Sequence, residues 1–253
     1  MIHVKICGIT NLEDALVATE AGADMLGFVF FPRSPRYIEP ERAGEIISVL
    51  RQRDHALSCV DVFVNESPER VREIAATAQL DVVQLHGDES PEMVRDLCTR
   101  HPEPSSTVFR PRSGEGSRSG AIEILRPFGP QNDRTVTHRA YKALRPRNEA
   151  EAQALVNQYR AAVNGNTPAF IVDAFDAQRF GGTGACADWS IAAAIAREFP
   201  ILLAGGLNAD NVAQAVRVVQ PWGVDVSSGV ERTPGVKDHD KVQRFIRNVR
   251  GVD

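Results

Sequence analysis

The sequence predicts one α/β domain, a (β/α)8 TIM barrel that spans the whole chain, residues 1–253. Short apolar segments alternate with amphipathic stretches, and eight such pairs follow one another. Strict alternation is typical of parallel strands that right-handed helical crossovers connect. An open doubly wound sheet needs fewer strands, and the turn at residues 7–11 lacks its G-x-G-x-x-G pattern. A closed barrel accommodates eight units in a chain of this length.

The eight predicted strands are short and rich in Val, Ile, Leu and Phe. Gly, Pro, Asn or Asp lies at their ends, which is typical of strands buried on both faces of a parallel sheet. The predicted strands are residues 4–9, 25–30, 57–64, 82–86, 140–144, 169–174, 201–204 and 223–227.

Helix-start signals follow these strands. Asn11 can cap the first helix, which has acidic residues in its first turn. Ser67 and Ser90 each precede a proline, the residue favoured at the first helical position. Further helices are predicted to begin at residues 188–190 and 208–211, and the last covers residues 238–250.

Composition and charge exclude several classes of protein. Hydrophobic residues make up 43% of the chain and charged residues 25%, which allows a large core. No apolar run approaches the roughly 20 residues that cross a bilayer. The formal net charge of −4 argues against a broad nucleic-acid surface. We therefore expect neither a membrane nor a nucleic-acid partner, although a small cationic pocket for an anionic metabolite is compatible with this charge.

The cysteines predict no metal site and no disulfide framework. Cys7, Cys59, Cys98 and Cys186 are far apart and form no C-x-x-C pair. The patterned sequence begins at the N-terminus and leaves no room for a signal peptide. We expect a cytoplasmic protein without a cofactor, and a monomer, because no long apolar helix face is left over.

Residues 101–138 interrupt the alternation between the fourth helix and the fifth strand. They contain several prolines and a run of Ser, Gly and Arg at residues 112–120. In a barrel this connection lies on the face opposite the active-site loops. We expect a flexible insertion, and a partner-docking element is the alternative.

Candidate catalytic residues lie at the carboxyl ends of the predicted strands, where barrel enzymes carry their active sites. Lys5 and Cys7 share one face of the first strand, which we expect to be the barrel interior. A nearby lysine and a helix amino end both favour a thiolate, although a buried cysteine can also be an inert hydrophobe. Asp173 ends an apolar strand and is either a general acid or a structural cap.

Two loops predict a phosphate site. Gly205 and Gly206 follow the seventh strand, and Ser228 and Gly229 follow the eighth. Glycines let backbone N–H groups approach an anion, and barrels often hold phosphate at these two loops. A tight turn is the alternative for Gly205 and Gly206.

Other polar residues at strand ends complete the candidate site. Arg33 or Arg36 could bind a substrate carboxylate through two hydrogen bonds. Gln84 and His86 share a face, so at least one should reach the cavity, although a structural histidine is equally compatible. Asp225 adjoins the first strand once the barrel closes and could pair with Lys5.

Together these segments resemble the phosphoribosylanthranilate isomerase family. The resemblance covers residues 1–100 and 140–251, and the insertion at 101–138 is the departure from it. The matching motifs are KICGIT at residues 5–10, GFVF at 27–30, SPRYI at 34–38, VFVN at 62–65, QLHG at 84–87, GGTG at 181–184 with DW at 188–189, LAGGL at 203–207 and VDVSSGVE at 224–231.

The resemblance implies an Amadori rearrangement in tryptophan biosynthesis. N-(5-phosphoribosyl)anthranilate becomes 1-(2-carboxyphenylamino)-1-deoxyribulose 5-phosphate, with no redox cofactor. It implies that Asp173 is the general acid, that Cys7 is the general base, and that Arg36 binds the anthranilate carboxylate. We also expect His86 to bind the substrate. Phosphate would bind the amides named above, and Lys5, Gln84 and Asp225 would support the site.

Two alternatives are considered, and only the second belongs to another functional class. One is the sister isomerase of histidine biosynthesis, or a barrel that catalyses both reactions; these enzymes resemble the chain but have an aspartate where Cys7 stands. The other is a sensor of phosphoribosyl ligands that lacks catalysis and signals through residues 101–138. The presence of Cys7, Asp173 and Arg36 argues against the sensor.

Overall fold

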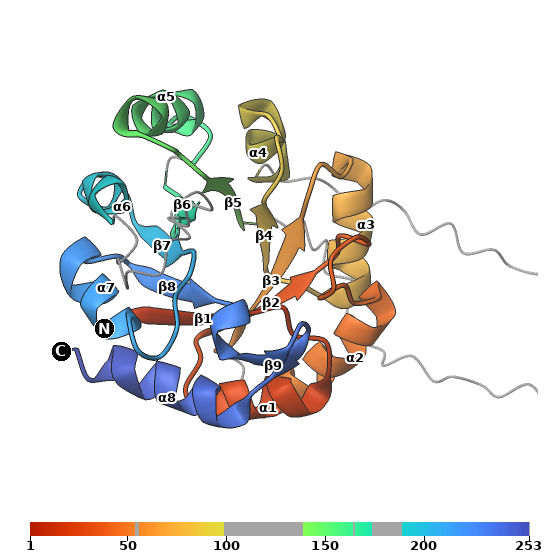
Figure 1. Ribbon diagram of the computed structural model, residues 1–253. Coiled ribbons are helices and arrows are strands. Elements are labelled where there is room, and N and C mark those ends of the chain that lie inside the picture. The colour runs from red at the N-terminus through yellow and green to blue at the C-terminus, as the bar shows by residue number, and fades with distance from the viewer. Residues whose placement is uncertain (54–55, 99–138, 164, 174–188, 253) are drawn as a thin grey trace, which may run out of the picture.

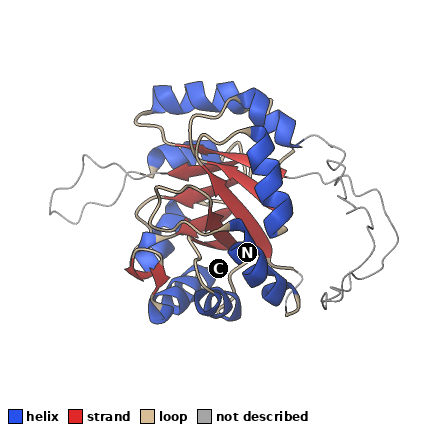
Figure 2. Ribbon diagram, turned by 90° about the vertical axis from the view of Figure 1, so that its right-hand side faces the viewer, coloured by secondary structure: helices blue, strands red, loops and turns tan. Residues whose placement is uncertain are grey.

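The structure of the protein, a computed structural model, describes residues 1–53, 56–98, 139–163, 165–173 and 189–252. Within these ranges eight parallel strands close into a barrel in chain order, β1 to β8 (Figure 1). Eight α-helices in the same ranges surround the strands, as the side view in Figure 2 shows. The predicted TIM barrel is confirmed. The predicted insertion at 101–138 lies outside the described residues.

All eight predicted strands are present, and their ends differ from the prediction by no more than two residues. The strands are β1 (His3–Cys7), β2 (Met25–Val29), β3 (Ser58–Phe63), β4 (Val82–Leu85), β5 (Arg139–Leu144), β6 (Phe170–Asp173), β7 (Ile201–Ala204) and β8 (Gly223–Val226).

The helices begin where capping chemistry satisfies their first N–H groups. The side chain of Asn11 accepts a hydrogen bond from the backbone of Asp14, and Ser67 caps its helix in the same way. The helices are α1 (Leu12–Glu20), α2 (Pro40–Arg51), α3 (Pro68–Ala78), α4 (Pro91–Cys98), α5 (Glu149–Tyr159), α6 (Ser190–Ala196), α7 (Val212–Val219) and α8 (His239–Arg250).

Two apolar layers hold the barrel together. The larger layer fills the space between strands and helices, where outward side chains of the strands meet the buried helix faces. Burying one large apolar side chain there contributes roughly 1.5–3 kcal/mol. The smaller layer lies inside the barrel and consists of Met25, Val60, Val82, Tyr141, Ala143, Ile171, Leu202 and Ala204.

A short hairpin follows the last barrel strand, and the sequence analysis did not predict it. The 3-10 turn η2 (Ser228–Val230) leads into β9 (Glu231–Thr233), which pairs antiparallel with β10 (Val236–Lys237). The hairpin lies beside the barrel opening in Figure 1. Within the described parts of the chain, no helix combines the length and apolarity that a bilayer crossing requires.

Candidate functional site

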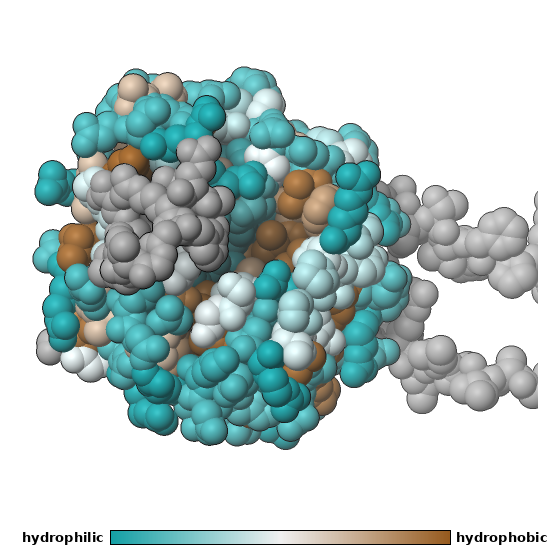
Figure 3. Space-filling model, viewed as in Figure 1, coloured by the Kyte–Doolittle hydropathy of each residue, from teal (hydrophilic) through white to brown (hydrophobic). Residues whose placement is uncertain are grey.

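A cavity of about 420 Å³ opens at the carboxyl ends of the strands. Figure 3 shows a hollow near the middle of the molecule, with apolar side chains inside it and polar ones around it. The structure brings nine of the twelve candidate residues to the cavity wall, whereas Lys5, Arg33 and Gly229 are not in the lining. The nine are Cys7, Arg36, Gln84, His86, Asp173, Gly205, Gly206, Asp225 and Ser228.

Cys7 ends β1, and its side chain is almost fully buried at the cavity. It is paired with Gly27 of β2, and a Cβ atom on Gly27 would lie 2.8 Å from the Cys7 Sγ. Burial raises the pKa of the Cys7 thiol and outweighs the opposing influence of Lys5 and Lys237. The expectation that its surroundings favour a thiolate is therefore corrected. The thiol is the resting form at neutral pH.

Beneath Cys7, a buried polar network fills the barrel interior. The Lys5 Nζ donates to Asp225 Oδ1 at 2.9 Å and to Gln84 Oε1 at 2.8 Å. The Tyr141 hydroxyl donates to the same Gln84 oxygen. Burial alone would lower the pKa of Lys5, but the charge of Asp225 and its hydrogen bond raise it above its usual value. Lys5 is therefore a fixed cation below the site, paired with Asp225 as the sequence suggested.

The same network fixes the protonation of His86. The Gln84 Oε1 accepts from two donors, so its Nε2 faces His86 Nδ1 at 2.9 Å and donates to it. This orientation places the imidazole proton on Nε2. Burial, together with the charges of Arg145 and Lys5, lowers the pKa of His86 to about 4. His86 is thus a neutral hydrogen-bond donor at the cavity wall, not a proton acceptor at neutral pH.

Arg36 reaches the cavity from the loop after β2. Its aliphatic stem crosses Gly8, because a Cβ atom on Gly8 would lie 2.6 Å from the Arg36 Cδ. The Nε and Nη2 groups of Arg36 donate to the two carboxylate oxygens of Glu231 at 2.8 and 2.7 Å. Its Nη1 group and the second proton of Nη2 form the remaining edge of the guanidinium. That edge matches the shape of a carboxylate.

The glycines after β7 have the backbone that the phosphate prediction requires. Gly205 and Gly206 have φ angles of 90° and 64°, which glycine adopts without strain. Nearby, the Ser227 hydroxyl is buried and has no hydrogen-bond partner among the described residues. Gly229 has a packing role instead, because a Cβ there would lie 1.9 Å from the carbonyl oxygen of Leu207.

Asp173 ends β6 and lines the cavity with its partly exposed side chain. In the closed barrel, β7 and β8 separate β6 from β1. The carboxyl group of Asp173 and the thiol of Cys7 therefore enter the cavity from different sides of its wall. A ligand held between these strands can meet an acid and a sulfur base.

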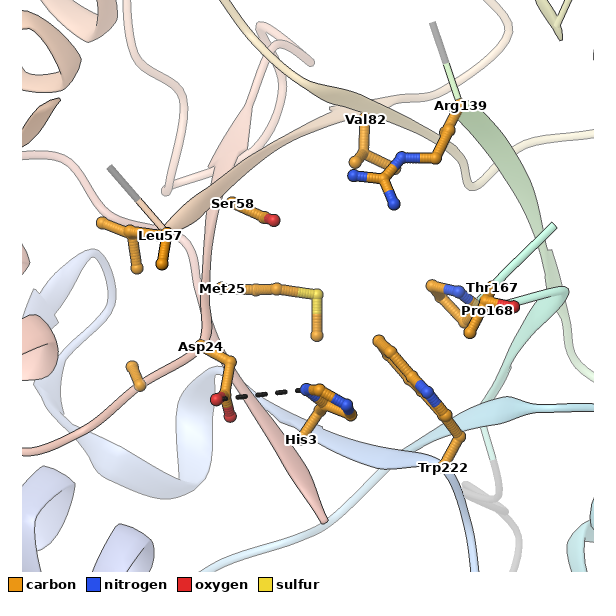
Figure 4. A pocket seen from close by; sticks show the side chains of 12 residues that line it. His3, Asp24, Met25, Leu57, Ser58, Val82, Arg139, Thr167, Pro168 and Trp222 are labelled. Atoms are coloured by element: carbon orange, nitrogen blue, oxygen red, sulfur yellow. Dashed lines mark ion pairs between the residues drawn. The ribbon is translucent and has the colours of Figure 1, made fainter. Parts of the chain in front are cut away.

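A second cavity lies at the amino ends of the strands (Figure 4). His3 stacks on Trp222 with ring centroids 4.1 Å apart, and its ring lies 3.9 Å from Asp24. The 290 Å³ space contains none of the candidate residues. The amino end of a TIM barrel contributes stability and not catalysis, so the carboxyl-end cavity is the candidate active site. No cluster of three or more His, Cys, Asp or Glu suited to a metal occurs within the described ranges.

Comparison with known proteins identifies the family. The model of the N-(5'-phosphoribosyl)anthranilate isomerase family matches residues 4–108 and 134–248. The isomerase of Pelobacter propionicus is 42% identical over 247 residues, covering 98% of this chain and 95% of the relative. The solved isomerase of Thermotoga maritima has a TM-score of 0.74 at 38% identity, covering 99% of this chain and 100% of that one.

The chain belongs to the N-(5'-phosphoribosyl)anthranilate isomerase family. Another solved isomerase of the family is 37% identical, with a TM-score of 0.72 and coverage of 99% of this chain and 100% of that one. It is a complex with reduced 1-(o-carboxyphenylamino)-1-deoxyribulose 5-phosphate. Residues 109–133 lie between the two ranges that the family model matches.

Four residues at or beside the candidate site were not predicted from the sequence. Ser228 was predicted from the sequence, but its neighbour Ser227 was not. The position of Ser227 directly after β8 could have indicated that it reaches the cavity. Gly27 faces the barrel interior, where a glycine in a strand often marks a close approach. Glu231 and Lys237 belong to the unpredicted hairpin, and only the structure shows that they reach Arg36 and Cys7.

Proposed function

We propose that this chain catalyses the Amadori rearrangement of N-(5-phosphoribosyl)anthranilate in tryptophan biosynthesis. The product is 1-(2-carboxyphenylamino)-1-deoxyribulose 5-phosphate. The observation that carries the proposal is the joint placement of Cys7, Arg36, His86 and Asp173 on the wall of one cavity. Both proton transfers of the reaction can use these side chains, so the mechanism needs no cofactor.

The first step opens the ribose ring. Asp173 donates its proton to the ring oxygen while the bond between that oxygen and C1 breaks. The lone pair of the anthranilate nitrogen forms a C=N bond to C1, which gives an iminium ion. A general acid contributes about 10²–10⁴-fold to such a step. Asp173 suits this role because it ends its strand at the cavity and is partly shielded from water.

The second step removes the C2 proton. Cys7 takes this proton as a thiolate, and the C2–H electron pair neutralises the iminium to give an enolamine. Protonation at C1 and loss of the hydroxyl proton at C2 then give the ketone. The raised pKa of the thiol means that only a fraction of the enzyme holds the base form at neutral pH. The positive charges of Lys5 and Lys237 limit this rise in the pKa of the thiol.

The cavity supplies complementary groups for both ends of the substrate. The free edge of Arg36 would bind the anthranilate carboxylate, and the apolar side chains of Val29, Phe31 and Val62 would contact the ring. The phosphate would bind the loops after β7 and β8, and the unpartnered hydroxyl of Ser227 is available to it. His86 would donate a hydrogen bond to the sugar from Nε2.

The decisive assay follows the fluorescence of phosphoribosylanthranilate with purified protein and without added metal or nucleotide. We expect conversion to the aminoketose. A parallel assay with the aminoaldose of histidine biosynthesis tests the bifunctional alternative. Turnover of that substrate alone, or of neither, would contradict the proposed function.

A cytoplasmic monomer is part of the proposal. Within the described ranges only two large apolar side chains are exposed, Met1 and Val218, which supports a monomer. One solved structure contains monomers generated from the dimeric isomerase of Thermotoga maritima, so a dimer is the alternative for this chain. Light scattering coupled to size-exclusion chromatography would give the mass directly.

A further inference from the structure

The guanidinium of Arg36 is held along one edge by a buried carboxylate. Glu231 accepts hydrogen bonds from Nε and Nη2 in a side-on, two-bond geometry. The Glu231 side chain is only 5% exposed, whereas that of Arg36 is 23% exposed. The contact therefore fixes the plane of the guanidinium from inside the protein and leaves its opposite edge toward the cavity that Arg36 lines.

Glu231 is itself held by Lys237, which the hairpin places opposite it. The antiparallel register pairs Lys237 with Glu231, and the Lys237 Nζ lies 3.1 Å from Glu231 Oε1. The Lys237 side chain is fully buried, and its Nζ also donates to the carbonyl oxygen of Cys7 at 2.6 Å. The ammonium group of Lys237 thus connects Glu231, the partner of Arg36, with the backbone of Cys7, the proposed base.

The charges of Arg36, Glu231 and Lys237 together favour an anionic ligand. Arg36 and Lys237 each carry +1 and Glu231 carries −1, so the cluster has a net charge of +1. Burial raises the pKa of Glu231, but Arg36 and Lys237 pull it below its ordinary value, so the carboxylate stays ionised. An isolated Arg36–Glu231 pair would be neutral and would attract a substrate carboxylate weakly. Lys237 restores the positive charge.

We propose that Glu231 and Lys237 are positioning residues that make Arg36 selective for the carboxylate of the substrate. Glu231 sets the orientation of the Arg36 guanidinium. Lys237 compensates the negative charge of Glu231 and connects Glu231 to β1 through the carbonyl oxygen of Cys7. The inference rests on the proposed function. It adds two residues outside the cavity wall that determine the specificity for the substrate carboxylate. Neither residue contacts the ligand in this arrangement.

The test compares two stable product analogues. Both are 1-deoxyribitol 5-phosphates with a phenylamino group at C1, and only one has the 2-carboxylate. Glu231→Gln should raise the inhibition constant of the carboxylated analogue about tenfold, the scale of one charge-assisted hydrogen bond. The constant of the carboxylate-free analogue should stay within about twofold. KM should rise while kcat changes little.

A thermodynamic cycle shows whether Glu231 acts through Arg36. In an Arg36→Ala background, Glu231→Gln should have no further effect on the carboxylated analogue. Lys237→Met should give the same selective loss, and Lys237→Arg should restore much of it. If Glu231→Gln does not fold, Glu231→Asp and the Lys237 pair decide the question in the same assay.

Asp81→Asn is the matched control. It also replaces a carboxylate that is paired with an arginine, Arg51, but it lies just before the amino end of β4, away from the candidate site. It should lower thermal stability without changing either inhibition constant. Equal weakening of both analogues by Glu231→Gln, or additive effects in the Arg36→Ala background, would overturn the inference. Absence of wild-type turnover would instead contradict the proposed function, so the two failures are distinguishable.

Discussion

Gly27 and Cys7 are register partners on β2 and β1, and no side chain other than hydrogen fits between them. A Cβ atom on Gly27 would lie 2.8 Å from the Cys7 Sγ and 3.2 Å from the Lys5 Cε. The thiol therefore occupies the volume that a larger residue on the neighbouring strand would take. The position of the proposed base depends on this absence of a side chain.

Gly27→Ala should lower kcat by at least about tenfold, because the new methyl group displaces the thiol from the sugar. KM should change less, since Arg36 and the phosphate loops are not touched. Steady-state kinetics with phosphoribosylanthranilate would measure both. Gly44→Ala is the control; its methyl group would meet the backbone of α3 at 3.2 Å and should leave kcat unchanged. Normal kcat in Gly27→Ala would show that the thiol position is not critical.

Asp225→Asn should lower the pKa of the Cys7 thiol. The carboxylate of Asp225 opposes formation of the thiolate, and its removal leaves Lys5 as an unbalanced cation nearby. The rising limb of kcat/KM against pH should move to lower pH, and alkylation of Cys7 by iodoacetamide should accelerate at neutral pH. Cys59, whose pKa burial raises to about 12, serves as the unreactive thiol in the same protein. An unchanged alkylation rate would refute this electrostatic link.

Asp173→Asn should lower kcat by about 10²–10⁴-fold, because an amide cannot donate the required proton to the ring oxygen. Cys7→Ala should have an effect of similar size. Both variants should still bind the reduced product analogue with affinity close to that of the wild type, measured by calorimetry. A variant that retains near-normal kcat would remove its residue from the proposed acid–base pair.

Arg36→Ala should act mainly on KM, with an increase of about tenfold or more, since it removes the cation that meets the carboxylate. The variant also leaves Glu231 with Lys237 as its remaining charged partner. The measurement is the KM for phosphoribosylanthranilate at constant ionic strength. An unchanged KM would clear Arg36 of the carboxylate role.

The burial of Asp61 should make the free energy of unfolding depend on pH in an unusual way. Both of its carboxyl oxygens are buried without a hydrogen-bond partner among the described residues, and burial raises its pKa well above the usual value. As pH rises above about 4, the unfolded chain releases this proton while the folded chain retains it. The free energy of unfolding should therefore fall with rising pH until the folded-state pKa is reached.

Asp61→Val should remove that contribution and stabilise the protein by about 1–3 kcal/mol at neutral pH. Urea unfolding at about pH 5 and about pH 8 would measure the change. The variant should gain more stability at the higher pH. An equal gain at both values would mean that the folded-state carboxyl of Asp61 is already ionised at about pH 5, which would contradict the raised pKa.

The fold was predictable because each local signal agreed with the barrel. The caps at Asn11 and Ser67, the apolar strands and the strict alternation all indicated the same topology, which the structure confirms. The strand ends then located the cavity residues, because parallel strands in a closed barrel bring their carboxyl ends together.

Other properties of the site depend on distances that sequence position does not contain. The sequence indicates that the nearby lysine and burial oppose each other at Cys7 but gives no measure of either, and in the structure burial has the larger effect on the pKa of Cys7. The hairpin that brings Glu231 and Lys237 to Arg36 is too short to give a periodic signal. Residues 181–184, which belong to the resemblance, lie outside the described residues.

A crystal structure with the reduced carboxyphenylamino-deoxyribulose phosphate analogue tests the account most directly. We predict that its carboxylate binds the free edge of Arg36 and that its phosphate lies on the loops holding Gly206 and Ser228. The C2 atom should face the Cys7 Sγ, with the carboxyl group of Asp173 on the other side of the sugar. An analogue seated in the cavity at the amino ends of the strands, or with C2 remote from Cys7, would contradict the account.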